Sequence, residues 1–304
     1  MTARRILGVS MALTFLLALA AGPALAAPQD EAATGASFVG SDMCVECHED
    51  YQESLGKTPH GKAGFAKLSE HGCETCHGPG SVHVEDPSAF QPRVTDLAVE
   101  EQNAVCQGCH DGGDQFFWKG SMHESRDLTC TSCHGVHSYK SDVKQLKTAT
   151  VMEQCFTCHK DIRAQTWKRS HHPIREGQIT CRDCHNPHGA QSDKMVDAAS
   201  INEQCYSCHA EKRGPFLWDH APVREACTNC HTPHGSNHLK LQKTSVPYIC
   251  QQCHSNTRHP GTLYDRTRLA DGTNPANREF SRACVNCHSQ IHGSNHPSGW
   301  ALQR

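Results

Sequence analysis

The chain is organised around residues Cys227 to His231, which read Cys-Thr-Asn-Cys-His, with free histidines at His220 and His234 on either side. A Cys-x-x-Cys-His sequence is the attachment site of a c-type haem. The two thiols add across the porphyrin vinyl groups, and the histidine that follows is placed beneath the iron as proximal ligand. An imidazole on the second face of the iron closes the site and gives an electron-transferring haem.

The same motif occurs ten times and uses all twenty cysteines of the chain, so that none is left over. This pattern predicts ten covalently bound haem c groups, held by two thioethers each. The attachment residues are Cys44, Cys47, Cys73, Cys76, Cys106, Cys109, Cys130, Cys133, Cys155, Cys158, Cys181, Cys184, Cys205, Cys208, Cys227, Cys230, Cys250, Cys253, Cys284 and Cys287. The proximal ligands are His48, His77, His110, His134, His159, His185, His209, His231, His254 and His288.

Zinc ribbons and disulfides are the other common uses of such cysteines. A zinc site needs paired Cys-x-x-Cys elements or mixed Cys/His sets, but it does not need a histidine directly after every second cysteine. Disulfides do not impose a two-residue gap ten times over. The cysteine pattern therefore favours haem attachment over both alternatives.

The first 26 residues have the form of a secretory signal peptide. Arg4 and Arg5 make a short basic region, residues 6–21 are apolar, and Ala24-Leu25-Ala26 is a small-x-small cleavage site. We expect the mature chain to begin near Ala27 and to work in the periplasm. No other apolar run is long enough to span a bilayer. Without Arg4 and Arg5 the chain keeps 27 basic against 32 acidic side chains, a net charge of −5 that disfavours nucleic acid as a partner.

The composition predicts a core made of haem rather than of side chains. Aromatic residues are only 6% of the chain, and its 37% hydrophobic residues include the haem-binding cysteines and the leader. Each macrocycle offers a large apolar surface, whose burial contributes about 25 cal/mol per Å². We therefore expect a multihaem cytochrome c fold, mostly irregular with short α-helices, little or no β structure, and an elongated haem stack as its core.

The motifs fall into five pairs, and each pair forms one two-haem repeat of a single domain over residues 27–304. Repeats of this size favour a stacked, quasi-linear arrangement. The third and fourth repeats align best. Thr150-x-x-Glu153 and Ser200-x-x-Glu203 have the form of capping boxes, which predicts a short helix leading into each first motif.

The repeats also predict the second axial ligands. Fourteen of the 24 histidines lie outside the motifs, and each repeat supplies one between its motifs and one after the second. His171 competes with His172, and His292 with His296. Which distal histidine serves which iron is not readable from the sequence. The expected distal ligands are His60, His83, His123, His137, His171, His188, His220, His234, His259 and His292.

The chain resembles the MtrA/DmsE/PioA-type periplasmic decahaem cytochromes. The resemblance rests on ten motifs in about 300 residues, on the segment from Glu211 to Trp218 and on the ending from Asn286 to Gly299. It implies a narrow haem wire partly inserted into an outer-membrane β-barrel. Such a wire links periplasmic or inner-membrane donors and acceptors to an outer-surface multihaem cytochrome or reductase.

Two other functions compete with this electron conduit. A multihaem reductase needs an iron with an open coordination position, often marked by a lysine in place of the motif histidine, whereas every motif here ends in histidine. A periplasmic shuttle that never enters a barrel is not separated from the conduit by the sequence. We expect an electron carrier without catalytic residues, and we leave the direction of electron flow open.

Overall fold

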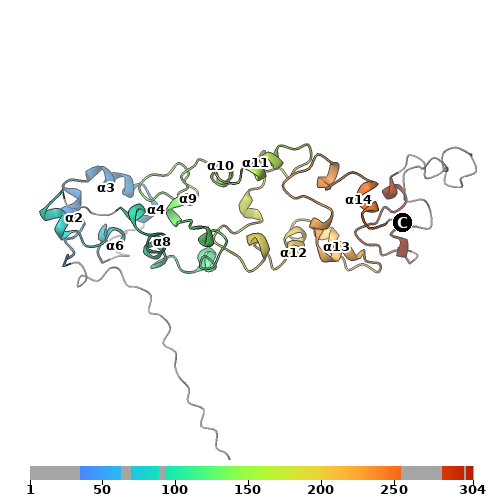
Figure 1. Cartoon of the computed structure of the whole chain (residues 1–304), viewed down its shortest axis with the longest axis horizontal. Coiled ribbons are helices and arrows are strands. Elements are labelled where there is room, and N and C mark those ends of the chain that lie inside the picture. Colours follow the sequence, from blue (N-terminus) through green and yellow to red (C-terminus); the bar gives the residue numbers. More distant parts are fainter. Residues whose placement is uncertain (1–34, 63–69, 89–92, 255–282, 298, 304) are drawn as a thin grey trace, which may run out of the picture.

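The computed structural model describes residues 35–62, 70–88, 93–254, 283–297 and 299–303. Figure 1 shows an elongated molecule whose elements follow one another along the long axis, from α2 (Ser41–Val45), α3 (Glu49–Gly56) and α6 (Glu74–His77) at one end to α14 (Tyr248–Gln251) near the other. Order in the sequence is therefore order in space. The expected signal peptide lies outside the described residues, and so does His259.

All helices in the described residues are short, and α8 is the longest with nine residues. Named strands do not occur in this part of the chain, which has only isolated β-bridges between single residues. The expected fold class is thus confirmed. The remaining helices are α4 (Pro59–Lys62), α7 (Ser81–Glu85), α8 (Val99–Gln107), α9 (Cys130–Cys133), α10 (Val151–Phe156), α11 (Lys160–Thr166), α12 (Ile201–Tyr206) and α13 (Ala221–Glu225).

Each haem motif is itself one helical turn. In all ten motifs the backbone N–H of the histidine donates to the carbonyl of the first cysteine, over distances from 2.8 Å at His288 to 3.2 Å at His77. This bond closes the 13-atom ring of an α-helix, and so brings the first thiol and the histidine to the same side of the chain. One helical turn is enough to place the cysteines and the histidine of a motif, and the helices that carry the motifs are accordingly short.

The two predicted helix starts occur where the sequence places them. Thr150 Oγ1 accepts from the backbone N–H of Glu153 at 3.1 Å, and Ser200 Oγ accepts from that of Glu203 at 3.2 Å. Each bond satisfies one of the unpaired amides in the first turn of a helix. The helices that follow, α10 and α12, deliver the first cysteines of the fifth and seventh motifs.

The polypeptide has almost no apolar core of its own. Among the described residues, the buried apolar side chains are Ala36, Trp118, Leu146, Phe156, Ile174 and Val196. They are spread along the rod instead of forming one cluster in sequence. The polypeptide forms a thin layer around the interior of the rod, and few apolar side chains are buried in it.

Successive repeats are joined by two-way backbone bridges. Ser170 and Ser236 exchange both of their backbone hydrogen bonds, at 2.9 and 2.7 Å, and Trp218 and Ser294 do the same at 2.9 Å each. In both cases a segment between the motifs of one repeat pairs with the segment that follows the second motif of the next repeat. These bridges fix how neighbouring repeats stack.

Candidate haem centres

One continuous cavity of about 6020 Å³ runs through the molecule, and all twenty cysteines and all ten motif histidines line it. Divided among ten motifs this is about 600 Å³ each, which lies within the range of about 300–1,000 Å³ for a single ligand site. The lining fits haem c in both size and chemistry: thiols for the vinyl groups, imidazoles for iron and an apolar wall.

Consecutive motifs are neighbours along this cavity. Within a repeat, the thiols of the first cysteines of the two motifs lie close enough to influence each other's pKa, as those of Cys155 and Cys181 do. Between repeats, the second cysteines interact, as Cys133 does with Cys158. The pattern links all ten motifs in sequence order, through Cys44–Cys73, Cys76–Cys109, Cys106–Cys130, Cys133–Cys158, Cys155–Cys181, Cys184–Cys208, Cys205–Cys227, Cys230–Cys253 and Cys250–Cys284.

Nine motif histidines each face a histidine from outside the motifs, with ring centroids 6.0–6.4 Å apart. Two metal–imidazole bonds of about 2.0 Å, with the half-widths of the two rings, give a centroid spacing of about 6.2 Å. The pairs are His48–His83, His77–His137, His110–His60, His134–His188, His159–His123, His185–His234, His209–His172, His231–His292 and His254–His220.

Burial favours the neutral form of some of these imidazoles, and the neutral form is the one that binds a metal. Desolvation, helped by cationic neighbours and by the facing histidine, lowers the pKa of His188 and of His292 to about 4 each. Desolvation also lowers the pKa of His134 and His234. The residues therefore fit haem c: the cysteines would carry the thioethers and the paired imidazoles would bind iron, and the bound haem supplies one-electron redox chemistry.

The pairs reveal a rule that the sequence did not. Most distal histidines serve a motif in a neighbouring repeat: His123, from the second repeat, faces His159 of the third, and His188, from the third, faces His134 of the second. The exception is His48 of the first motif, which faces His83 of its own repeat. Most facing pairs therefore join residues of two neighbouring repeats.

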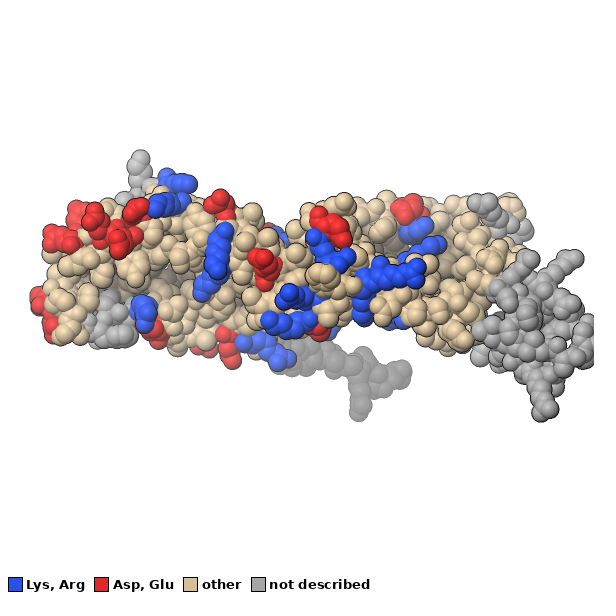
Figure 2. Space-filling model, turned by 90° about the horizontal axis from the view of Figure 1, so that it is seen from above, with Lys and Arg blue, Asp and Glu red and all other residues tan. Residues whose placement is uncertain are grey.

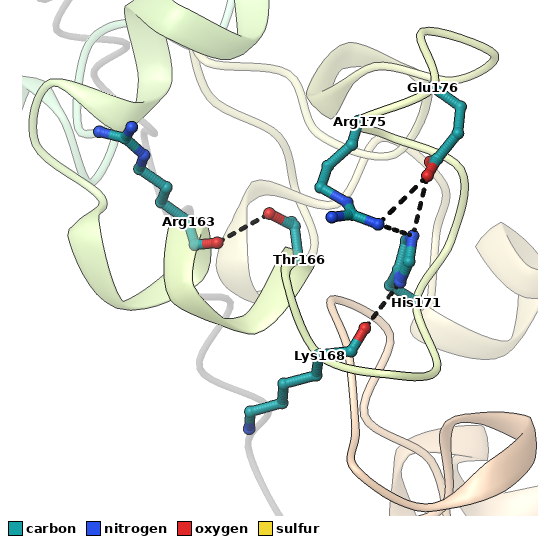
Figure 3. Close-up of polar contacts among 6 residues, drawn as sticks. All are labelled: Arg163, Thr166, Lys168, His171, Arg175 and Glu176. Atoms are coloured by element: carbon teal, nitrogen blue, oxygen red, sulfur yellow. Dashed lines mark hydrogen bonds and ion pairs between the residues drawn. The ribbon is translucent and has the colours of Figure 1, made fainter.

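The structure places His172, and not the expected His171, opposite His209, with ring centroids 6.4 Å apart. Figure 3 shows the His171 ring between Lys168 on one side and Arg175 and Glu176 on the other, and its Nδ1–H donates to the carbonyl of Lys168 at 2.8 Å. Its Nε2 lies 3.2 Å from Glu176 Oε1 and 3.1 Å from Arg175 Nη2.

The reason is the register of the loop. His172 stands five residues after Trp167, as His123 stands five residues after Trp118. The alternative alignment, on the Pro-x-Arg-Glu segment, places the ligand one residue too early. The choice of His292 over His296 agrees with the structure, which sets His292 opposite His231 at 6.2 Å.

The other spare histidines have different surroundings. His71 stacks on Phe38 with a centroid distance of 3.7 Å and an interplanar angle of 8°. The backbone N–H groups of His238 and His296 donate to Ser236 and Ser294. The predicted ligand His259 lies outside the described residues.

Sequence reasoning missed the groups that orient the proximal histidines of the fourth, sixth, eighth and tenth motifs. His134, His185 and His231 each donate Nδ1–H to a lysine carbonyl, at 2.6 Å to Lys144, 2.9 Å to Lys194 and 2.8 Å to Lys240. Because a carbonyl only accepts, this bond fixes the tautomer and leaves Nε2 for the iron. His288 makes the same bond to Ala301 at 2.6 Å.

These three lysines share an unusual backbone. Lys144, Lys194 and Lys240 have φ values of 55°, 60° and 56°, and the residue after each is left-handed as well. Left-handed non-glycine residues cost about 1–2 kcal/mol each and persist only where the surroundings enforce them. The signal available in the sequence is a lysine nine or ten residues after the histidine of the fourth, sixth and eighth motifs.

A buried asparagine connects the two motifs of a repeat. Asn202 Oδ1 accepts from the backbone N–H of Cys227 at 2.7 Å, and its Nδ2 donates to the carbonyls of Val223 and Arg224. Asn103 holds Cys130 in the same way at 2.9 Å. Both asparagines stand three residues before the first cysteine of their repeat.

Comparison with known proteins agrees with this geometry. A family described as the doubled Cys-x-x-Cys-His motif matches residues 171–214 and 220–259, the NrfB-like cytochrome c-type family matches residues 73–158, and the cytochrome c554 and c-prime family matches residues 25–78. The multiheme cytochrome MtrA of Shewanella baltica is 42% identical over 275 residues, which cover 87% of this chain and 81% of that protein. The cytochrome c-type protein NrfB of Escherichia coli is 30% identical over 40% of this chain and 65% of its own length. The polyheme cytochrome OmcB of Geobacter sulfurreducens is 24% identical over 53% of this chain and 27% of its own length.

The short-helix fold and the line of Cys-x-x-Cys-His motifs define a multihaem c-type cytochrome. Within that class, the extent of the match shows that the chain belongs to the MtrA family of multihaem cytochromes. Family membership makes the chain an electron carrier and not an enzyme, as its motifs predict.

Proposed function

We propose that the chain is a ten-haem electron conduit between the periplasm and the cell exterior, seated in an outer-membrane β-barrel partner. It would pass electrons between periplasmic or inner-membrane proteins and an outer-surface multihaem cytochrome or reductase. Extracellular respiration and iron oxidation both fit such a conduit, with current in opposite directions.

The observation that carries this proposal is the single file of ten motifs along one narrow cavity. Each motif neighbours the next in sequence order, as with Cys155 and Cys181, so an electron entering at one end has a continuous path to the other. A globular store of haems would need no such order.

The histidine pairs support transfer without catalysis. An iron held between two imidazoles has no open position for a small substrate. We propose that the nine observed pairs, together with His288 and His259, are the axial ligands of ten irons. The set differs from the sequence prediction only in the replacement of His171 by His172.

Charged side chains are unevenly distributed along the rod (Figure 2), which suits partners of different charge at different places along it. Figure 2 shows acidic side chains gathered at the end that holds α2 and α3, and basic side chains concentrated in the other half. The exposed acidic residues at that end are Asp42, Glu46, Glu49, Asp50 and Glu53.

Apolar side chains exposed along the rod suit a molecule that is sheathed by another protein. Phe116, Trp167 and Trp300 are 67%, 66% and 68% exposed. Contiguous exposed apolar groups, such as the Phe116 ring packed edge-on against the Phe117 ring, mark interaction surfaces. None of the helices in the described part of the chain combines the length and apolar character that a bilayer crossing needs.

Co-purification tests the conduit. A C-terminally tagged chain, extracted from outer membranes in mild detergent, should elute with a β-barrel protein and an outer-surface haem protein in stoichiometric amounts. Cells that lack the chain should lose electron exchange with solid iron oxide but keep reduction of soluble periplasmic oxidants. If the tagged protein runs alone in the periplasmic fraction, the chain is a soluble shuttle and the conduit is wrong.

Mass spectrometry tests the domain limits and the haem count. We propose a signal peptide over residues 1–26 and a mature domain over residues 27–304, built from five two-haem repeats. The intact mature protein should begin at Ala27 and carry the mass of ten haems. A different number of haems would remove one or more motifs from the proposed wire.

A further inference from the structure

Two turns of the same form follow the second motifs of the third and fourth repeats. They are Asn186-Pro187-His188-Gly189 and Thr232-Pro233-His234-Gly235. In each turn the glycine N–H donates to the carbonyl of the first residue, at 3.0 Å in one and 3.2 Å in the other. The histidine of each turn faces a motif histidine: His188 faces His134, and His234 faces His185.

The residue before that histidine makes a second contact, to a different centre. The Pro187 carbonyl accepts Nδ1–H of His123 at 2.7 Å, and the Pro233 carbonyl accepts Nδ1–H of His172 at 2.7 Å. His123 faces His159 of the fifth motif, and His172 faces His209 of the seventh. One dipeptide in each turn therefore touches the ligands of two consecutive motifs.

The same arrangement recurs at the next junction without proline. The backbone of Ile291 hydrogen-bonds His220, which faces His254 of the ninth motif. Its neighbour His292 faces His231 of the eighth motif. The contact therefore occurs between the fourth and fifth motifs, between the sixth and seventh, and between the eighth and ninth. Because the last of these has no proline, the contact depends on the backbone of the repeat and not on a particular side chain.

Glycine is required for the turns to come this close. A Cβ on Gly189, where φ is +112°, would lie 2.2 Å from the Phe117 carbonyl oxygen. A Cβ on Gly235, where φ is +153°, would lie 2.0 Å from the Gln165 carbonyl oxygen. Each turn therefore packs directly against the chain segment that precedes a distal histidine: Phe117 precedes His123, and Gln165 precedes His172.

We propose that these turns position two irons at once: the histidine of the turn binds one iron, and the carbonyl just before it fixes the distal histidine of the next. The proposal rests on the axial ligands assigned under the proposed function. A carbonyl on Nδ1 sets the tautomer and ring orientation of a metal-bound imidazole and raises its basicity. The turn also creates a path of covalent bonds and one hydrogen bond between neighbouring irons.

Glycine-to-alanine substitution in the haem-loaded protein tests this role. Gly189→Ala should change two of the ten haems, those of the fourth and fifth motifs. One fifth of the bis-histidine low-spin signal in electron paramagnetic resonance should shift or be lost, and two haems should change potential in a redox titration. Gly113→Ala is the matched control, because Gly113 also has a positive φ, of +60°, but no atom within 4 Å of the added Cβ. It should leave all ten haems unchanged.

Two further variants separate the possible outcomes. His188→Met keeps the turn and its carbonyl but changes one ligand, so it should raise the potential of a single haem. Asn186→Ala removes the bonds from Asn186 to His188 N–H and to the Asp114 carbonyl without a clash, and should shift the same two haems as Gly189→Ala even if that protein fails to fold. If Asn186→Ala and Gly189→Ala change one haem or none, the positioning role is wrong. If His188→Met changes no haem, the axial assignment itself fails.

Discussion

At the residue scale, His171 and His172 show that position in a loop, not residue type, decides which imidazole can bind an iron. The two are adjacent, yet His172 faces His209 across a haem-sized gap while His171 is held by Lys168, Arg175 and Glu176. Arg175 is fixed in turn over the Trp167 ring, 4.6 Å from its centroid. His171 is thereby committed to polar partners.

Substituting each of the two histidines should therefore give different spectra. We expect His172→Ala to open one iron in ten, so that about one tenth of the haem becomes high-spin and binds carbon monoxide when reduced. His171→Ala should keep every haem low-spin. A protein in which His171→Ala, and not His172→Ala, opens an iron would return the ligand role to His171.

The left-handed lysines allow a second prediction at this scale. Lys240→Val places a β-branched residue at φ 56° and should lower stability by about 1–3 kcal/mol. It should also loosen His231, whose Nδ1–H donates to that carbonyl. Lys240→Gly keeps the carbonyl and should be tolerated. Thermal unfolding followed at the haem absorption band measures the difference, and equal midpoints for the two variants would contradict the role of the backbone.

At the element scale, short helices suffice because each needs only to place a cysteine and to hold the next motif. α12 ends with the seventh motif at Cys205, while Asn202 in its first turn holds Cys227 of the eighth. The asparagine is 8% exposed, so its hydrogen bonds are made where water does not replace them.

Asn202→Ala should consequently destabilise the fourth repeat. It leaves the Cys227 N–H and the part-buried carbonyls of Val223 and Arg224 without their amide partner, at a cost of about 2 kcal/mol. The exposed Asn237→Ala serves as the control and should have no effect. Denaturant titration of the haem-loaded proteins compares the two, and an unchanged midpoint for Asn202→Ala would show that the bond is dispensable.

At the scale of the whole molecule, the polypeptide supplies little cohesion of its own. The described residues bury six apolar side chains around a cavity of about 6020 Å³. Under the proposed ligation, histidines that cross between repeats, such as His123 and His188, would tie each repeat to the next through iron. Without haem, the apolar wall of this cavity would be exposed to water, which is unfavourable.

We therefore expect the apoprotein to be unfolded. Chain produced without haem attachment should show little helical signal by circular dichroism and rapid proteolysis, whereas the haem-loaded protein should resist both. A protease-resistant apoprotein with a cooperative thermal transition would mean that the polypeptide supplies a core of its own.

The repeat pattern made much of the site predictable. A motif of fixed spacing and a histidine at a fixed place in each repeat indicate a haem site whatever the surrounding fold. Eight of the ten expected distal histidines lie opposite a motif histidine, from His60 through His292. His172 and not His171 faces a motif histidine. Two alignments of this loop differ by one residue, and the side-chain direction reverses with each residue of an extended chain.

By itself, the sequence determined the haem motifs, their pairing into five repeats and the short-helix character of the fold, because these depend on local spacing and composition. The tertiary structure alone decided which distal histidine faces which motif, since that depends on how one repeat stacks on another. It also decided the carbonyl acceptors at Pro187, Pro233 and Lys194. Every residue carries the same carbonyl, so only the path of the backbone brings one of them to an imidazole.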